Sequence, residues 1–208
     1  MTEELQRVDA WYAARCGKVT ASRIADVVAK TKTGVSASRA AYMAQLLTER
    51  LTGKPPESGF VNAAMEWGTE QEPFARAAYS AKTGELVEEV GFIDHPTIPN
   101  SGASPDGVIA DGEGLVEFKA PTSHVHLEYI FEGKPPQKYL YQMAWQMAVT
   151  NAKYCDFCSF DPRLPERYRL SIVRVQRDDK LIATLEAEVK AFLEELDQKI
   201  AKLETMQL

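Results

Sequence analysis

Two short apolar runs joined by a turn limit the possible folds of this chain more than any other feature of its sequence. Residues 108–110 and 115–118 are apolar apart from Glu117, and they flank Asp111-Gly112-Glu113-Gly114. Acidic residues and glycines at that density are typical of a tight hairpin connection. The two runs are therefore predicted to pair as antiparallel strands.

The charged residues around this hairpin carry the chemistry. Because side chains alternate along a strand, Glu117 and Lys119 should project to one face and the apolar residues beside them into a core on the other. Ser104-Pro105-Asp106-Gly107 precedes the hairpin, and the loop is expected to bring Asp106 beside Glu117. Two carboxylates and one ammonium would then lie within reach of a single point.

Two carboxylates at that distance repel each other unless one is protonated or a cation lies between them. Hard oxygen ligands suit Mg²⁺ or Mn²⁺. A magnesium ion held by Asp106, Glu117 and the backbone carbonyl of Phe118 would keep positions open for water and a phosphate oxygen. Lys119 could orient the attacking water and stabilise charge on phosphorus. This pattern favours a nuclease centre, with a surface Asp beside a solvated Glu/Lys pair as the alternative.

Length and composition predict one domain. The 208 residues, 45% of them hydrophobic, fit a single α/β domain over 1–208. We expect a basic helical part over about 1–54, a catalytic core over about 60–177 and a C-terminal helix over about 178–205. No apolar run is long enough to cross a membrane, and the charged N-terminus lacks a signal-peptide core, which predicts a soluble intracellular protein without a membrane partner.

The net charge of −6 is unevenly distributed. Residues 1–54 hold nine lysines and arginines but only five aspartates and glutamates. A basic face on an acidic body can bind phosphates while the rest of the surface keeps the protein in solution. Lys30 and Lys32 lie in a Gly- and Ser-containing segment, 30–38, which is predicted to be a loop and a candidate DNA contact.

Local patterns predict the other elements. We expect helices over 3–15, after 22, over 40–51, from Gly68 or Thr69 to 83, over 139–149 and from 178 onward, and strands over 86–94, 154–160 and 169–175.

Thr20-Ala21-Ser22 is predicted to cap the short helix that follows it. Hydroxyls and free amides at a helix start can form an anion site, and Arg15 just upstream could close that site on a phosphate. A simple N-cap beside a surface arginine is the alternative.

Glu72 allows two interpretations. Acidic residues near a helix start are favoured by the helix dipole, which explains Glu70 and Glu72 without a function. Glu72 could also be a third carboxylate directed at the metal.

Cys155 and Cys158 form a Cys-x-x-Cys pair inside a predicted strand. Iron–sulfur clusters need four cysteines, and the chain has three. Packing in the core is therefore the preferred interpretation of the pair.

Several motifs, taken together and in order, resemble those of the lambda exonuclease or YqaJ-type viral recombinase nucleases, also called phage-type alkaline exonucleases. The resemblance covers nearly the whole chain and rests on Trp11, Arg15, Gly17, Thr20-Ala21-Ser22, Trp67-Gly68, Glu72, Ser104-Pro105-Asp106-Gly107, Glu117-Phe118-Lys119, Gln142 and Asp161-Pro162-Arg163.

This resemblance implies a restriction-endonuclease-like PD-(D/E)xK fold, an α/β architecture with a mixed central sheet flanked by helices. It implies a processive, Mg²⁺-dependent 5′-to-3′ exonuclease on linear double-stranded DNA ends, which releases 5′-mononucleotides and leaves a 3′ single strand. Members form ring-shaped homotrimers and act with a single-strand annealing protein in recombination, here in the cytoplasm of a bacterial or phage-infected cell.

The same resemblance assigns residues. Asp106, Glu117, the Phe118 carbonyl and Glu72 would hold two Mg²⁺ ions, with Mn²⁺ as a substitute, and Lys119 would assist the nucleophilic water. Roles near the DNA end are assigned to Arg15, Thr20 and Ser22 at the 5′-phosphate, and to Ser104 and Gln142 beside the scissile group.

The chain departs from lambda exonuclease at three positions. Ala63 and Met65 replace a lysine and a leucine wedge, and His124 replaces an arginine. Met65 would still part the terminal base pair by apolar insertion. Two other functions stay open, namely a structure-specific endonuclease or junction resolvase on the same fold, and a non-catalytic DNA-binding recombination module.

Overall fold

A four-stranded sheet contains the hairpin expected from the sequence. The computed structural model describes residues 5–32, 34–55 and 63–206. In it β6 (Gly107–Ile109) pairs antiparallel with β7 (Gly114–Lys119), so the predicted hairpin is confirmed. β8 (Tyr154–Phe160) lies parallel to β7, and β9 (Leu170–Gln176) runs antiparallel to β8. The sheet is therefore mixed, in the order β6-β7-β8-β9.

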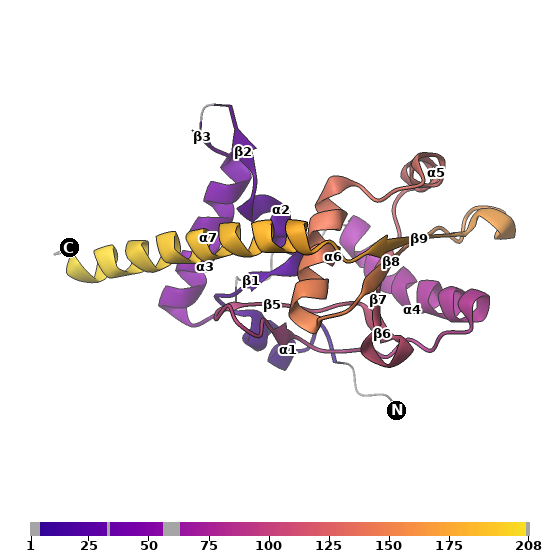
Figure 1. The fold of residues 1–208 in the computed structure, drawn as a ribbon, viewed down its shortest axis with the longest axis horizontal. Helices are drawn as coiled ribbons and strands as arrows, with labels where there is room; N and C mark the ends of the chain where they lie inside the picture. Colours follow the sequence, from indigo (N-terminus) through magenta and orange to yellow (C-terminus); the bar gives the residue numbers. More distant parts are fainter. Residues whose placement is uncertain (1–4, 33, 56–62, 207–208) are drawn as a thin grey trace.

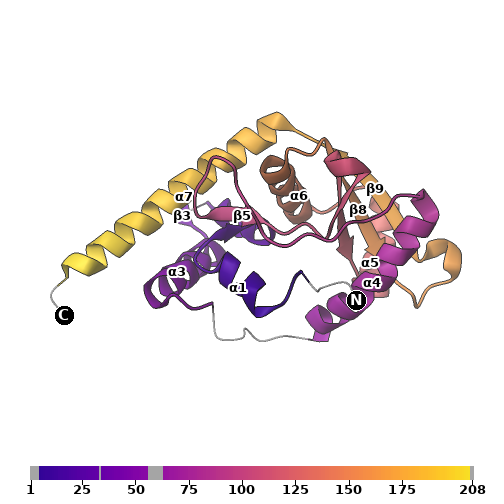
Figure 2. The same cartoon turned by 90° about the horizontal axis from the view of Figure 1, so that it is seen from below.

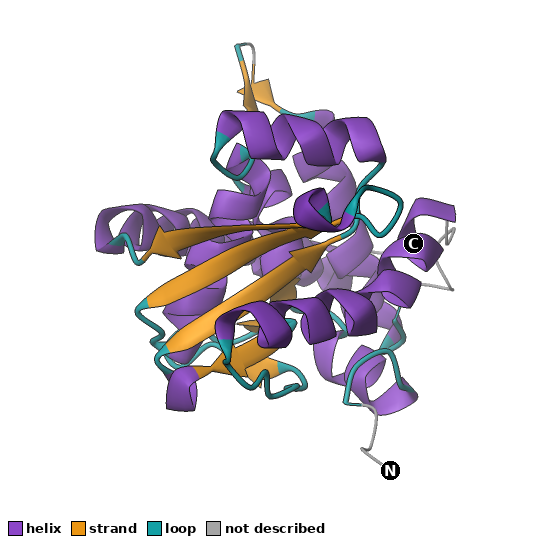
Figure 3. Cartoon of the chain, turned by 90° about the vertical axis from the view of Figure 1, so that its right-hand side faces the viewer, coloured by secondary structure: helices purple, strands orange, loops and turns teal. Residues whose placement is uncertain are grey.

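Helices cover both faces of this sheet (Figure 3). Leu115 of β7 joins the larger core with residues of α6 (Gln137–Thr150), whereas Val116 and Phe118 join a second core with Tyr79 of α4 (Ala63–Thr83). The alternation predicted for β7 is thus confirmed. Odd-numbered residues of the strand face α6, and even-numbered residues face α4.

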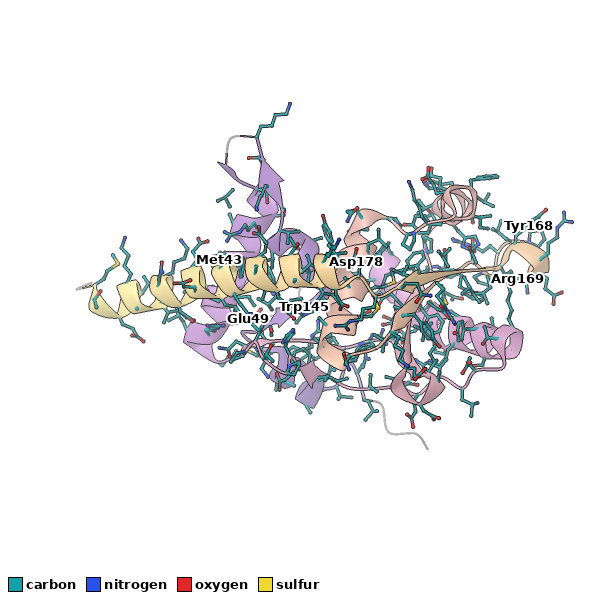
Figure 4. All side chains as sticks on the ribbon, viewed as in Figure 1. Met43, Glu49, Trp145, Tyr168, Arg169 and Asp178 are labelled. Carbon is teal, nitrogen blue, oxygen red and sulfur yellow. The ribbon has the colours of Figure 1, made fainter. Side chains whose placement is uncertain are left out.

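A smaller sheet connects the N-terminal part to the centre of the molecule. β5 (Ser101–Ala103) lies between β1 (Val19–Thr20), which is parallel to it, and β4 (Ile93–Asp94), which is antiparallel. Trp145 of α6 is fully buried against this sheet and donates to the Gly102 carbonyl over 3.2 Å. Figure 4 labels Trp145 near the middle of the molecule, and Tyr168 and Arg169 at the end opposite the C-terminus.

The remaining elements complete the chain in order. They are α1 (Asp9–Arg15), η1 (Ala21–Arg23), α2 (Ile24–Val27), β2 (Lys30–Thr31), β3 (Gly34–Val35), α3 (Ala37–Thr52), η2 (Ala110–Gly112), α5 (Ser123–Glu132), η3 (Glu166–Tyr168) and α7 (Asp179–Thr205).

The long helix α7 lies across α3 and reaches beyond it toward the C-terminus (Figures 1 and 2). Asp178 caps its start by accepting the N–H groups of Lys180 and Leu181. Phe192 is fully buried and stacks on Tyr42 of α3 at 5.7 Å between ring centroids. This amphipathic packing agrees with the predicted C-terminal helix. Among the described helices, none combines the length and apolar character that crossing a membrane requires.

Several element boundaries were predicted wrongly. Residues 86–92 form no strand beyond a single bridge between Glu88 and Val108 of β6, and pairing with β5 begins only at Ile93. The helix predicted over 3–15 covers Asp9–Arg15, while residues 3 and 4 lie outside the described residues. Within 30–38, β2 and β3 pair antiparallel, and Ala37 and Ser38 already belong to α3, so only part of the predicted loop is irregular.

Two local explanations also fail. Thr20 has the extended backbone of an N-cap residue, but its side chain accepts no hydrogen bond from η1. Helix α4 extends back to Ala63, so Glu70 and Glu72 lie beyond its first turn. The helix dipole acts within the first turn and therefore does not account for Glu72.

Candidate active site

Glu117 accepts hydrogen bonds on both of its carboxylate oxygens. Its side chain is fully buried between β7 and α6. Lys119 and the amide of Gln142 donate to Oε1, the latter over 2.6 Å, and the amide of Gln146 donates to Oε2 over 2.7 Å. A carboxylate oxygen has two acceptor positions. Oε1 is therefore saturated, and Oε2 keeps one position for a further partner.

Asp106 is held by the backbone of β7. Its Oδ2 accepts the Phe118 N–H over 2.8 Å. β6 pairs with β7 only as far as Val116, so the Phe118 N–H is available to the side chain. The N–H and C=O of one strand residue point to the same side. The Phe118 carbonyl therefore lies on the Asp106 side of β7.

The charge on Asp106 is destabilised by its surroundings. Burial raises the pKa of this carboxyl, and the neighbouring carboxylates of Glu117 and Glu72 raise the pKa further, against the opposing effect of Lys119. A group of negative charges in a buried place needs a cation to remain ionised. Lys119 supplies one such positive charge, and Arg7 also interacts electrostatically with Asp106.

Lys119 keeps its proton in this setting. Burial alone would lower the pKa of the ammonium group, but the carboxylates of Glu117 and Asp106 outweigh burial and raise the pKa above its ordinary value. The Nζ atom also lies 5.2 Å from the centroid of the Tyr139 ring. The side chain is thus a fixed positive charge beside the two carboxylates.

Glu72 approaches the same region from α4 and is paired with two arginines. Arg7, from the segment before α1, bonds to Oε2, and Arg76, one turn along α4, lies 3.1 Å from Oε1. Within residues 5–32, 34–55 and 63–206, no three His, Cys, Asp or Glu side chains form a group able to hold a metal ion. Each Glu72 oxygen accepts one of these bonds and keeps a second acceptor position, but a metal ion bound there would lie beside the positive charge of an arginine.

The donor set nevertheless fits a hard divalent cation. Asp106 has one oxygen bound to Phe118 N–H, Glu117 keeps an acceptor position on Oε2, and the Phe118 carbonyl lies on the same side. Oxygen donors of this kind suit Mg²⁺ or Mn²⁺. A cation here would also relieve the repulsion that raises the pKa of Asp106.

Asp106 and Glu72 border a cavity of about 720 Å³, whereas Glu117 lines a smaller neighbouring space. The walls of the larger cavity include Glu72, Asp106, Lys119 and Gln142, and we call it the carboxylate cavity. Met65 also lines it, close to the start of α4, and is 57% exposed. Four of the five predicted catalytic residues thus line one opening, with Met65 at its edge, and the fifth, Glu117, is buried beside it.

A second cavity, of about 360 Å³, lies around Arg15 and is called the Arg15 cavity. The Arg15 guanidinium lies 3.9 Å from the Trp11 ring centroid and donates to Ser104 Oγ over 3.2 Å. Within the described chain it forms no ion pair with a carboxylate. Burial lowers the pKa of Arg15, as expected for a cation without a close counter-ion.

The two cavities meet in a smaller space of about 160 Å³, the linking cavity. Ser104 lines it, and its hydroxyl accepts from Trp11 Nε1 over 2.9 Å. Ser22 and Arg7 line all three cavities. Thr20 lines the Arg15 cavity alone. The structure therefore brings the predicted phosphate residues next to the predicted catalytic residues.

Lys30 and Lys32 are placed elsewhere. They belong to the hairpin β2–β3, which projects from the molecule beside α7 (Figure 1). Lys30 forms an ion pair with Glu188 of α7 over 2.6 Å. The three cavities are lined by other residues, so these two lysines do not share the site with Arg15.

Sequence reasoning missed three residues of the site. Gln146 lies four residues after Gln142 on α6, and this spacing puts both amides on one face, so the pattern held a usable signal. Gln6 and Arg7 carried no signal, because they reach Pro105 and Glu72 across long stretches of chain.

The cysteine pair lies in the core, as preferred from the sequence. Cys155 and Cys158 are fully buried on β8 and are free thiols. Burial raises the pKa of both thiols well above the ordinary value.

Comparison with known proteins agrees with this geometry. The model of the YqaJ-like viral recombinase domain matches residues 10–153. No curated protein sequence matches the chain. Among solved structures, an alkaline exonuclease from Laribacter hongkongensis is 52% identical over 95% of this chain and 96% of that chain, with a TM-score of 0.88.

Two further structures extend the comparison. The same Laribacter protein in complex with dAMP matches at 53% identity over 94% of this chain and 96% of that chain, with a TM-score of 0.87. A phage-related exonuclease from Haemophilus somnus shares the fold at 16% identity over 89% of this chain and 96% of that chain, with a TM-score of 0.68. The mixed sheet with helices on both faces is consistent with the restriction-endonuclease-like fold. The family model covers more than half of the chain, and the chain belongs to the YqaJ-like viral recombinase family, to which the lambda-type exonucleases also belong.

Proposed function

We propose that the chain is a Mg²⁺-dependent exonuclease that digests linear double-stranded DNA processively from the 5′ end, releases 5′-mononucleotides and leaves a 3′ single strand for annealing-type recombination. The connection between the Arg15 cavity and the carboxylate cavity carries this proposal. A phosphorylated end suits the guanidinium in the first cavity. Metal-assisted hydrolysis suits the carboxylates in the second.

The relatives support the reaction class. A protein 52% identical to this chain is an alkaline exonuclease, and the same protein has been crystallised with dAMP. A nucleoside monophosphate is the chemical class of the product proposed here. Membership of a viral recombinase family supports DNA as the substrate.

Asp106, Glu117 and the Phe118 carbonyl would hold the metal, and Glu72 would join a second ion once released from Arg7. The bound metal would polarise the scissile phosphate and make water a better nucleophile near neutral pH. Lys119 holds a proton beside Glu117 and would stabilise the charge that develops on the phosphate oxygens. Gln142, which donates to Glu117 and lines the cavity, would orient that carboxylate.

The DNA end would be held by residues of the other cavities. Arg15 and Ser104 would bind the terminal 5′-phosphate, because a half-buried guanidinium and a hydroxyl already lie together there. Ser22 lies where the cavities meet and would contact the strand between them. Met65, an exposed apolar side chain at the edge of both larger cavities, would part the terminal base pair.

The assembly is part of the same proposal. A ring-shaped homotrimer threaded by DNA would keep the enzyme on its substrate, and a single-strand annealing protein would take over the 3′ strand. Both expectations rest on the family to which the chain belongs.

A time course on linear duplex DNA labelled on each strand in turn tests the proposal. We expect Mg²⁺-dependent loss of the 5′-ended strand only, with mononucleotide products, while a closed circular duplex in the same tube stays intact. Cutting of the circle would instead support a structure-specific endonuclease or junction resolvase. Binding without any cutting would support a non-catalytic recombination module.

A further inference from the structure

The segment before α1 is fixed to the loop that carries Asp106. Gln6 is buried, and its amide donates to the carbonyl of Val90 over 2.7 Å and to that of Pro105 over 2.8 Å. Pro105 is the residue directly before Asp106. These two hydrogen bonds, the one to Pro105 buried and the one to Val90 partly buried, set the position of residue 7 relative to the carboxylates.

The backbone of Arg7 is strained at this position. Its φ angle is +66°, in the left-handed region that residues with a Cβ seldom adopt. Such a conformation is unfavourable for a residue with a Cβ and persists only where the surroundings impose it. The strained backbone and the Gln6 bonds together direct the guanidinium to Glu72.

Arg7 and Arg76 both neutralise Glu72, but they differ in what else they touch. Arg76 is also paired with Glu89, and its side chain is 19% exposed. Arg7 has Glu72 as its ion-pair partner, is 36% exposed, and lines the Arg15, linking and carboxylate cavities. Arg7 is thus the more accessible of the two cations and the one on the route between the cavities.

Arg7 holds a positive charge against the carboxylate that a second metal ion would need, and two cations at that distance repel each other. A divalent cation carries twice the charge of the guanidinium, so it would replace Arg7 as the partner of Glu72. The displaced guanidinium would then face a space that a DNA phosphate enters. Guanidinium groups bind phosphates in the same two-pronged geometry as carboxylates, so the new partner suits Arg7 as well as the old one.

We propose that Arg7 is a transferable counter-ion, which neutralises Glu72 in the metal-free protein and moves to a phosphate of the DNA strand when metal and DNA bind. This inference rests on the proposed function and adds a positioning residue to it. Arg7 links the two binding events, because the metal frees the cation that the DNA then uses. Metal and DNA should therefore strengthen each other's binding through this residue.

Two measurements on Arg7→Ala test the proposal. Calorimetric titration with Mn²⁺ alone, without DNA, should show tighter binding by the variant, about 5-fold or more, because Glu72 has lost a competitor. Fluorescence anisotropy with a 5′-phosphorylated duplex should show about tenfold weaker binding by the variant in Ca²⁺ but little change in EDTA, where wild-type Arg7 stays on Glu72. In Ca²⁺ the slope of the logarithm of the binding constant against the logarithm of the salt concentration should become shallower by about 0.7–0.9. This is the contribution of one phosphate contact.

Arg76→Lys and Arg7→Lys are the matched controls. Arg76→Lys weakens the other arginine contact of Glu72 without altering a cavity wall, so the DNA affinity should not change. Arg7→Lys keeps the charge but not the fork, so it should restore part of the DNA affinity in Ca²⁺. Thermal melting of all variants identifies any that fail to fold.

Two results would contradict the proposal that Arg7 moves from Glu72 to a phosphate. One is an unchanged Mn²⁺ affinity in Arg7→Ala, and the other is an equal loss of DNA affinity in Ca²⁺ and in EDTA. The wild-type protein separates this failure from failure of the proposed function. If wild-type protein binds Mn²⁺ and digests the 5′-ended strand while the Arg7→Ala predictions fail, only the role of Arg7 is wrong.

Discussion

The Arg15 cavity and the carboxylate cavity adjoin each other, yet their charges are held in opposite ways. Arg15 rests on Trp11 and Ser104 and, within the described residues, has no carboxylate partner. Glu117 and Glu72 are each neutralised by cations of the chain itself, Lys119 for the first and two arginines for the second. One cavity keeps an unsatisfied positive charge, and the other keeps negative charges with replaceable partners.

This difference shows how a protein can prepare one site for an anion and the adjoining site for a cation. A buried guanidinium without a counter-ion gains most when a phosphate arrives. Buried carboxylates cannot be left unpaired without protonation, so they need an internal cation until a metal replaces it. A phosphodiester bridging both cavities would meet a guanidinium at one end and a metal centre at the other.

The largest expected effect separates catalysis from binding. Lys119→Ala should lower the single-turnover cleavage rate about 10³-fold, because the fixed charge beside the reacting phosphate is lost. Duplex affinity should stay close to wild type, because the Arg15 cavity is intact. Lys138→Ala is the control, since Lys138 lines the same cavity and lies over the same Tyr139 ring but forms no ion pair with a carboxylate of the described chain. If Lys119→Ala cleaves DNA as fast as Lys138→Ala, Lys119 does not stabilise the charge on the reacting phosphate.

The next effect concerns the choice of DNA end. Arg15→Ala should reduce the rate advantage of 5′-phosphate over 5′-hydroxyl ends by about 10- to 100-fold, the range for a hydrogen bond to a charged group. Parallel rates on the two substrates measure this ratio. Lys18→Ala is the matched control, because Lys18 lines the same cavity but is already paired with Asp94 over 2.6 Å. A ratio that stays the same in Arg15→Ala would place the end pocket elsewhere.

The smallest effect divides the two glutamines of α6. Gln146→Leu leaves Glu117 Oε2 without its donor and should lower stability by about 1 kcal/mol, since the change also removes an Oε1 atom that is buried without a partner. Added Mg²⁺ should recover much of that loss, as calorimetric melting would show. Gln142→Leu, at the cavity wall, should lower the cleavage rate more and the melting temperature less. If Gln146→Leu lowers the cleavage rate more than Gln142→Leu does, Gln146 is the glutamine that acts at the cavity.

Local patterns predicted the parts of the fold that local physics determines. The alternation of β7 placed Glu117 and Lys119 together, and the helical periodicity after Asp178 matches α7 closely. The strand predicted over 86–94 failed because a strand needs partners, and only Ile93 and Asp94 find them on β5. No periodicity within a segment reports whether a partner strand exists beside it.

The site divides along the same line. Asp106, Glu117 and Lys119 lie close together in the sequence. Turn and strand geometry alone therefore predicted that their side chains meet. The pairing of Arg7 with Glu72 joins residues that no local pattern connects, and it depends on a positive φ angle in a residue other than glycine. Contacts of this kind follow from the folded chain, and the sequence between the partners does not specify them.

The long reach of the Gln6 hydrogen bonds has a consequence for protein synthesis. Gln6 leaves the ribosome early, but its acceptor Pro105 follows about a hundred residues later, and β8, which pairs with β7, ends at Phe160. A chain is synthesised from its N-terminus, and a domain folds as a unit once its segments have been made. Asp106 and Glu117 are therefore synthesised before β8, the strand that supports them. The site can be completed only late in translation.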